Sequence, residues 1–196
     1  SAAACPVCRA VMRRLPAVQP ELDTARLRLR ALVAADAAAV VRLADDPAVS
    51  EFMLHMPHPY PRPAAEDWIR EAIDDWQSGG SPTWAITRRR DRALVGAAWL
   101  RWSPRHARAE LGYWLGRRHW GKGYAREAAA AAVGFGFDVL TTHRVFAQHL
   151  DGNDRSGVLL RAIGMRFEGV RRGHVRQGDR FRDLYGYAIT RDDRAG

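Results

Sequence analysis

The sequence predicts an α+β fold in which about four helices flank a mixed, mostly antiparallel sheet of about seven strands. Three observations support this prediction. A strand-like alternation follows the leader, three strand-like segments joined by short polar turns occupy the middle, and helices interrupt the later strands without the regular βαβ rhythm of a doubly wound fold. The 196 residues, 47% of them hydrophobic, are enough to bury one sizeable core.

The first predicted strand is 24–32, where Leu27 and Leu29 alternate with arginines. Alanine enrichment predicts a helix at 36–46, four prolines at 57–63 break regular structure, and apolar residues at helical spacing predict a helix at 66–77. The remaining predicted elements are strands at 84–87, 93–102 and 107–115, a helix at 124–140, a strand at 144–150, a helix at 154–163, and strands at 164–170 and 182–189.

The domain organisation predicted from the sequence is a disordered leader at 1–22, a single domain at 23–190 and a tail at 191–196. The leader holds the only two cysteines, Cys5 and Cys8, without a second Cys or His pair at ligand spacing, so we expect no metal site. No apolar run approaches the roughly 20 residues needed to span a bilayer, and no signal-peptide pattern is present. We therefore expect a cytoplasmic protein without a membrane partner.

The charge balance is basic, with 31 Lys and Arg against 22 Asp and Glu and a formal net charge of +9. Such a charge suits an anionic ligand, nucleic acid or an acidic partner. The arginines are scattered, however, and neither an RNA-binding sheet signature nor helix-turn-helix spacing is present. A basic nucleic-acid-binding protein is therefore an alternative only, and we expect no nucleic-acid partner.

The most informative segment is Trp-Gly-Lys-Gly-Tyr-Ala-Arg-Glu-Ala at 120–128, which lies between a predicted strand and a predicted helix. Main-chain N–H groups of such a loop and the positive end of the helix can converge on an anion. Glycines at 121 and 123 allow close approach of a diphosphate, although they could also serve only a tight turn. Neither the P-loop spacing nor the three-glycine dinucleotide fingerprint is present.

Residues 120–128 resemble the acyl-CoA pyrophosphate loop of the GNAT N-acetyltransferases, in the spelling of the RimJ/RimL branch that acetylates protein N-termini and various small amines. A second block, Asn153-Asp-Arg-Ser156 followed by Leu160 and Gly164-Met165, resembles the Asn-x-x-Ser, Leu and Gly-Phe of that branch. The resemblance extends over about 24–190. It implies the GNAT fold, with the sheet splayed between the fourth and fifth predicted strands, 107–115 and 144–150.

Two departures from the family pattern stand out. The usual loop, Gln/Arg-x-x-Gly-x-Gly/Ala, fits here from Arg118 or from Trp120; we prefer the second register because it leads directly into the helix. Several amine acetyltransferases of the superfamily have a tyrosine as general acid where this chain has Leu160. That role must belong to another residue or be absent.

The resemblance implies direct attack of an amine on acetyl-CoA, with no covalent acyl-enzyme. A main-chain amide near Leu115 would stabilise the oxyanion, Asn153 would hold the pantetheine arm, and Ser156 would donate toward the departing thiolate or only cap its helix. The expected acetyl-CoA-binding residues are Leu115, Trp120, Gly121, Lys122, Gly123, Tyr124, Ala125, Asn153 and Ser156.

Glu110 is the first candidate for the general base. It lies on the strand that leads to the loop, and the resemblance places it near the position where a histone-acetyltransferase branch of the superfamily has its base. The competing interpretation is a solvated carboxylate paired with Arg108 or Arg101. His119 and His149 are further candidates. The resemblance also implies that the loop 51–62 forms one wall of the acceptor pocket, with His55, His58 and Tyr60 as expected substrate-binding residues.

We therefore predict an acetyl-CoA-dependent N-acetyltransferase that acts on a primary amine, either a protein N-terminus or a small molecule, in a monomer or a homodimer. The main alternative is a GNAT-like domain that binds acyl-CoA as a sensor without turnover. This alternative is supported by the absence of the family tyrosine at Leu160 and by the lack of a single clear candidate for the general base.

Overall fold

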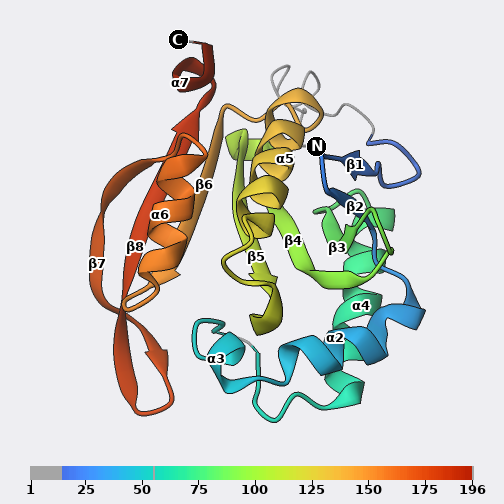
Figure 1. Ribbon diagram of the computed structural model, residues 1–196. Coiled ribbons are helices and arrows are strands. Elements are labelled where there is room, and N and C mark those ends of the chain that lie inside the picture. Colours follow the sequence, from blue (N-terminus) through green and yellow to red (C-terminus); the bar gives the residue numbers. More distant parts are fainter. Residues whose placement is uncertain (1–14, 55, 196) are drawn as a thin grey trace, which may run out of the picture.

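The computed structural model describes residues 15–54 and 56–195, and its centre is an eight-stranded sheet (Figure 1). The strand order is β1-β2-β3-β4-β5-β6-β8-β7. The strands are β1 (Leu22–Asp23), β2 (Leu27–Ala31), β3 (Thr83–Arg88), β4 (Leu94–Ser103), β5 (Arg108–Leu115), β6 (Arg144–Leu150), β7 (Arg166–Gln177) and β8 (Arg180–Thr190). Every neighbouring pair is antiparallel except β5 and β6, which confirms the mixed, mostly antiparallel α+β prediction.

Six α-helices occupy the described part of the chain: α2 (Ala37–Ala44), α3 (Pro47–Ser50), α4 (Arg62–Gln77), α5 (Tyr124–Asp138), α6 (Asp154–Ala162) and α7 (Arg191–Ala195). The sequence predicted α2, α4, α5 and α6. It missed α3, a single turn in which the Ala48 N–H donates to the carboxylate of the N-cap residue Asp46. It also missed α7, in the expected tail. None of the helices described is long and apolar enough to cross a membrane.

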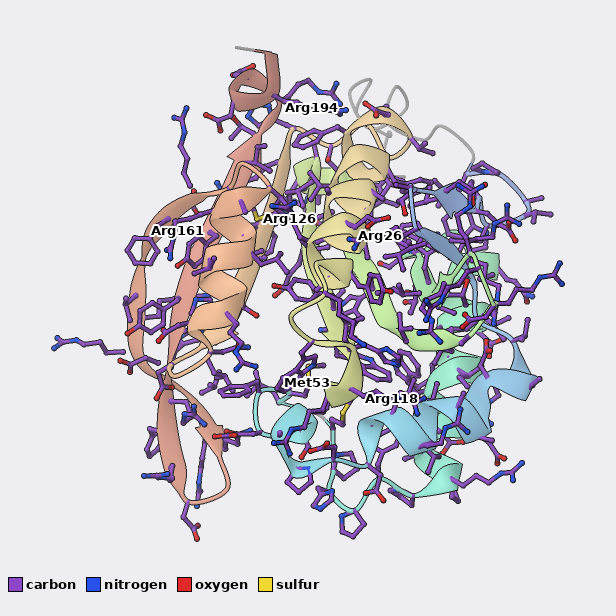
Figure 2. All side chains as sticks on the ribbon, in the orientation of Figure 1. Arg26, Met53, Arg118, Arg126, Arg161 and Arg194 are labelled. Carbon is purple, nitrogen blue, oxygen red and sulfur yellow. The ribbon has the colours of Figure 1, made fainter. Side chains whose placement is uncertain are left out.

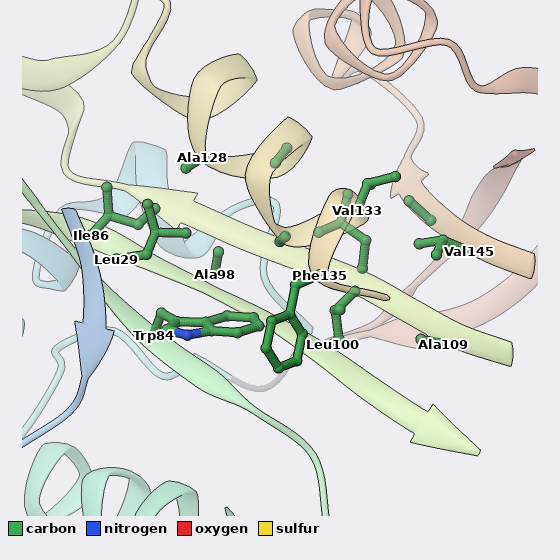
Figure 3. Close-up of a cluster of buried hydrophobic side chains, with 14 of the residues drawn as sticks. Leu29, Trp84, Ile86, Ala98, Leu100, Ala109, Ala128, Val133, Phe135 and Val145 are labelled. Atoms are coloured by element: carbon green, nitrogen blue, oxygen red, sulfur yellow. The ribbon is translucent and has the colours of Figure 1, made fainter. Parts of the chain in front are cut away.

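The sheet carries a core on each face. Trp84 and Ile86 of β3 and Leu100 of β4 pack with Ala128, Phe135 and other residues of α5 (Figure 3). A second cluster brings α2 and α4 against the opposite face around Trp114. Strand alternation explains this division, because Leu111 and Leu115 belong to the first cluster whereas Trp114 belongs to the second.

The sheet opens between β5 and β6. Their parallel pairing runs from Arg108 opposite Arg144 to Leu111 opposite Ala147 and then stops, although both strands continue (Figure 1). Gly116 N–H donates to Val95 O on β4, so two-residue periodicity directs the amides of Tyr113 and Leu115 away from β4. These amides therefore point toward the gap that β6 leaves.

Two parts of the fold differ from the sequence predictions. Residues 15–22 were expected to belong to a disordered leader, but Gln19 is buried and donates to Thr83 O, and Pro20 O accepts from the Trp84 indole. The last two strands are also longer than predicted. They form a hairpin of β7 and β8 in which nearly all of β7 is exposed or half-buried.

Candidate functional site

A single cleft of about 2060 Å³ passes through the opening of the sheet. On one side it reaches the glycine loop and the first turns of α5 and α6, and on the other it reaches α3, α4 and β4. A long ligand can thus lie on one side and meet a second reactant arriving from the other.

The glycine loop has the backbone geometry that its sequence predicts. Gly121 has φ +71° and Gly123, the N-cap of α5, has φ +75°, conformations that favour glycine. A Cβ at Gly121 would meet no atom within 4 Å, so no neighbour in the protein requires a glycine there. No side chain caps α5, which leaves the N–H groups of its first turn free for an anion.

Arg26, just before β2, fastens this loop to the rest of the molecule and was missed by the sequence analysis (Figure 2). Its guanidinium donates to Lys122 O (2.9 Å) and to the Glu127 carboxylate (2.7 Å), and it lies over the Tyr124 ring. Burial opposes ionisation of Glu127, yet hydrogen bonds from Thr24 and Arg26 lower its pKa from the ordinary value. The Lys122 side chain is exposed and lies outside the lining of the cleft.

Trp120 ties the loop to the end of β5. Its indole Nε1 donates to Leu115 O (2.8 Å), and the guanidinium of Arg155 lies over its ring. The Leu115 carbonyl is thereby occupied, while the Leu115 amide remains directed toward the gap. Trp120 thus positions the glycine loop through contacts within the protein.

The first turn of α6 presents two polar side chains to the cleft. Asn153 is the N-cap, but its side chain makes no capping hydrogen bond, so its amide is available to a ligand. Ser156 lies one turn before Leu160, which is only 1% exposed, and both therefore face the sheet. Leu160 is part of the core and offers no hydroxyl group at the position of the family tyrosine.

Tyr113 of β5 faces Ser156 across the gap, and it was not among the site residues expected from the sequence. Its hydroxyl oxygen is buried and has no hydrogen-bond partner among the described residues. Burial raises the pKa of Tyr113 to about 12, an effect that the neighbouring Ser156 hydroxyl partly opposes. The phenol therefore keeps its proton at every physiological pH.

Glu110 lies on the other side of the opening, at the wall nearest α4. Its Oε1 accepts a hydrogen bond from Gln148 Nε2 of β6 (3.0 Å). Arg101 is its cross-strand partner, but no arginine of the described chain lies within ion-pair distance of Glu110, so the competing interpretation is not supported. Arg108 instead lies over the Phe146 ring.

The two histidines named as further base candidates are buried. Burial first, and then Arg118, lower the pKa of His119 to about 4, so this ring is neutral at pH 7; its Nε2 accepts from Arg118 Nε. His149 bonds the Leu150 carbonyl through Nδ1 and stacks on Tyr185. Both line the cleft, and each has one nitrogen without a partner.

The expected acceptor wall is only partly present in the cleft. Tyr60 lines it from a buried position, and burial raises the Tyr60 pKa. His58 is exposed, lies beside Asp45 (Nδ1 to Oδ1 3.2 Å) and is not among the lining residues. His55 lies outside the described residues, as do Cys5 and Cys8.

The two ends of the cleft carry opposite charge. Arg126 of α5, labelled in Figure 2, lines the end near the glycine loop. Arg155 of α6 lines the same end. Asp67, Glu71 and Asp75, spaced four apart on one face of α4, line the other end. Among the described residues, Arg101 is the basic residue of the lining at this end, and Arg70 of α4 pairs with Asp67 from outside the lining. In a protein of net charge +9 this local reversal favours an anion at one end and a cation at the other.

Comparisons with known proteins agree with this geometry. A family model described as an acetyltransferase (GNAT) domain matches residues 26–166. An uncharacterized N-acetyltransferase, p20, from Bacillus licheniformis is 30% identical over 176 residues, which are 89% of this chain and 98% of the relative. These matches define the class of protein, an acyltransferase.

Solved structures share the fold. An acetyltransferase of the GNAT family from Bacillus anthracis superposes with a TM-score of 0.80 at 23% identity, covering 88% of this chain and 99% of the other. The ribosomal L7/L12 N-acetyltransferase RimL, in a structure that contains coenzyme A, reaches 0.80 at 18% identity, covering 89% and 99%. The chain belongs to the GNAT family of N-acetyltransferases, which use acetyl-CoA as the acyl donor.

Among the described residues, no group of three or more His, Cys, Asp or Glu side chains is arranged to hold a metal ion.

Proposed function

We propose that this protein transfers an acetyl group from acetyl-CoA to a primary amine by direct attack within a ternary complex at the cleft between β5 and β6. The observation that carries the proposal is the cleft itself. It passes through the sheet, with free main-chain donors and arginines at one end and carboxylates at the other.

The donor end would bind acetyl-CoA through the free amides at Gly121, Gly123, Tyr124 and Ala125, which suit the diphosphate. The side-chain amide of Asn153, which makes no capping hydrogen bond to α6, would hold the pantetheine arm along that helix. The Leu115 N–H, which points into the gap, would then donate to the thioester carbonyl oxygen. Such a donor typically contributes about 3 kcal/mol of transition-state stabilisation.

Glu110 would act as general base from the opposite side. The ammonium form of the acceptor first loses a proton to solvent. The amine nitrogen then bonds to the carbonyl carbon, and its remaining excess proton passes to Glu110. The carbon–sulfur bond breaks with its electron pair on sulfur, where Ser156 Oγ–H donates a hydrogen bond, and the thiolate takes its proton from water.

The acceptor would be an amine with a second positive charge, because three carboxylates of α4 line the end at which it enters. Both a small polyamine-like molecule and a basic N-terminal peptide meet that description. The similarity to RimL, by its name an α-N-protein acetyltransferase, supports a protein N-terminus as one form of the acceptor. The predicted homodimer, the cytoplasmic location and the role of Tyr60 in binding the acceptor stay predictions.

A second candidate function, an acyl-CoA sensor, is favoured by one observation, the buried Leu160 where several relatives place a tyrosine. A free-thiol assay with acetyl-CoA across amines and N-terminal peptides separates the two. Thiol release that depends on the amine supports transfer. Thermal stabilisation by acetyl-CoA without thiol release from any amine supports the sensor and contradicts our proposal.

A further inference from the structure

We propose that Tyr113 is a positioning residue that acts through Ser156, donating to Ser156 Oγ the hydrogen bond that leaves the Ser156 proton free to point at the leaving sulfur. This inference rests on the proposed function. It adds a residue of β5 to the donor side of the reaction, where the sequence analysis found only the serine.

The first argument is the unsatisfied hydroxyl group. A buried hydroxyl without a partner is costly, and such groups in folded proteins call for an explanation. The Tyr113 hydroxyl oxygen is buried and has no partner among the described residues, and Ser156 is the polar side chain that faces it. The Ser156 hydroxyl lies close enough to lower the Tyr113 pKa as a hydrogen-bond partner does, so pairing of the two hydroxyl groups would satisfy the buried oxygen.

The second argument is their place in the cleft. Tyr113 lies beyond Leu111, the last residue of β5 that pairs with β6, so its ring stands at the opening of the sheet. Tyr113 and Ser156 are the two hydroxyl-bearing residues that β5 and α6 contribute to the lining of the cleft. Leu160, one turn along α6, is apolar and packed in the core, and it cannot orient the serine by hydrogen bonding.

The third argument is the competition for the serine proton. A serine hydroxyl in the first turns of a helix can donate back to a main-chain carbonyl of the preceding turn, which directs its proton away from the cleft. A phenol that holds its proton up to a pH of about 12 remains a constant hydrogen-bond donor to Ser156 Oγ. Once Oγ accepts that bond, its own proton is free to point at the sulfur.

The test is a double-mutant cycle with Tyr113→Phe, Ser156→Ala and the combined variant, measuring kcat and KM by thiol release with the best acceptor of the panel. Loss of one aligned hydrogen bond should lower the kcat of Tyr113→Phe about fivefold and leave the KM for acetyl-CoA unchanged. Because Tyr113 acts through Ser156, the combined variant should be no slower than Ser156→Ala alone.

Two controls separate positioning from structure. Tyr185→Phe removes a hydroxyl on β8 outside the lining of the cleft and should keep the parent kcat. Thermal unfolding of Tyr113→Phe should have a midpoint close to that of the parent, since the variant loses one hydrogen bond to Ser156 but no longer buries a hydroxyl group. A lowered midpoint together with a lowered kcat would make Tyr113 a structural residue and overturn the inference.

The remaining outcomes are also decisive. Multiplicative losses in the combined variant, or a parent-like kcat for Tyr113→Phe, overturn the role of Tyr113 while acetyl transfer itself stands. If the parent protein releases no thiol with any amine, the proposed function fails first and this inference fails with it.

Discussion

Gly121→Ala tests the phosphate-binding loop with a control that the chain itself supplies. Gly121 has φ +71° and Gly178, in the turn between β7 and β8, has φ +60°; a Cβ at either would meet no atom within 4 Å. Alanine in this left-handed conformation costs about 1–2 kcal/mol. Both variants should therefore lose about the same free energy of unfolding, measured by chemical denaturation.

Only Gly121→Ala should weaken the binding of acetyl-CoA. If its methyl group keeps one diphosphate oxygen from a main-chain amide, the loss of one hydrogen bond to a charged group, about 1.5–3 kcal/mol, corresponds to roughly 10- to 150-fold in Kd. Titration calorimetry with acetyl-CoA provides the measurement. Equal destabilisation of both variants combined with parent-like affinity in both would refute the assignment of the loop.

Three other perturbations probe the rest of the cleft. Glu110→Gln should lower kcat about 100-fold or more in the free-thiol assay, whereas a parent-like kcat would exclude Glu110 as the base. Glu71→Gln should raise the KM for a doubly charged amine up to about fivefold at low salt and leave kcat unchanged. Glu66 lies outside the cleft and pairs with Arg62, so Glu66→Gln should leave both KM and kcat at the parent values. Because the pKa of His119 is lowered in the folded protein, the unfolded chain binds a proton at a higher pH than the folded chain does, and the free energy of unfolding should fall as the pH drops from about 6.5 to about 4. Denaturation curves of His119→Gln should show a smaller fall over that range. An equal fall would contradict a buried, neutral His119 in the folded protein.

Local signals predicted much of the fold. Alternation in β2, the punctuating turns between β3 and β4, and the alanine-rich run of α5 each report on their own segment, and the structure confirms them within a few residues. The hairpin of β7 and β8 was harder to predict. Both faces of β7 are largely exposed and it contains Gly169 and Gly173, so its sequence carries no apolar alternation.

The candidate site was predictable where one segment carries it. The loop at 120–125 and the block at 153–156 are each contiguous in the sequence, so their resemblance to the GNAT family could be seen there. The residues that hold the site in place come from distant parts of the chain. Arg26 reaches the loop from nearly 100 residues away, and Gln148 reaches Glu110 only through the parallel pairing of β5 and β6. No local pattern shows such contacts.

The opposite charge of the two ends could not be predicted from composition either. Asp67, Glu71 and Asp75 are ordinary surface carboxylates in the sequence, where the overall charge is positive. Their importance comes from the packing of α4 on the sheet, which leaves these three side chains along one end of the cleft. The overall charge pointed to no particular partner, and the proposed cationic acceptor follows from where these three carboxylates lie.

The most direct test of the central claim is a crystal structure of this protein with coenzyme A. The account predicts diphosphate oxygens within hydrogen-bonding distance of the amides at 121–125, and a sulfur atom in the gap between Leu115 and Ser156. A diphosphate bound elsewhere on the molecule, or a gap closed by side chains at saturating coenzyme A, would contradict it.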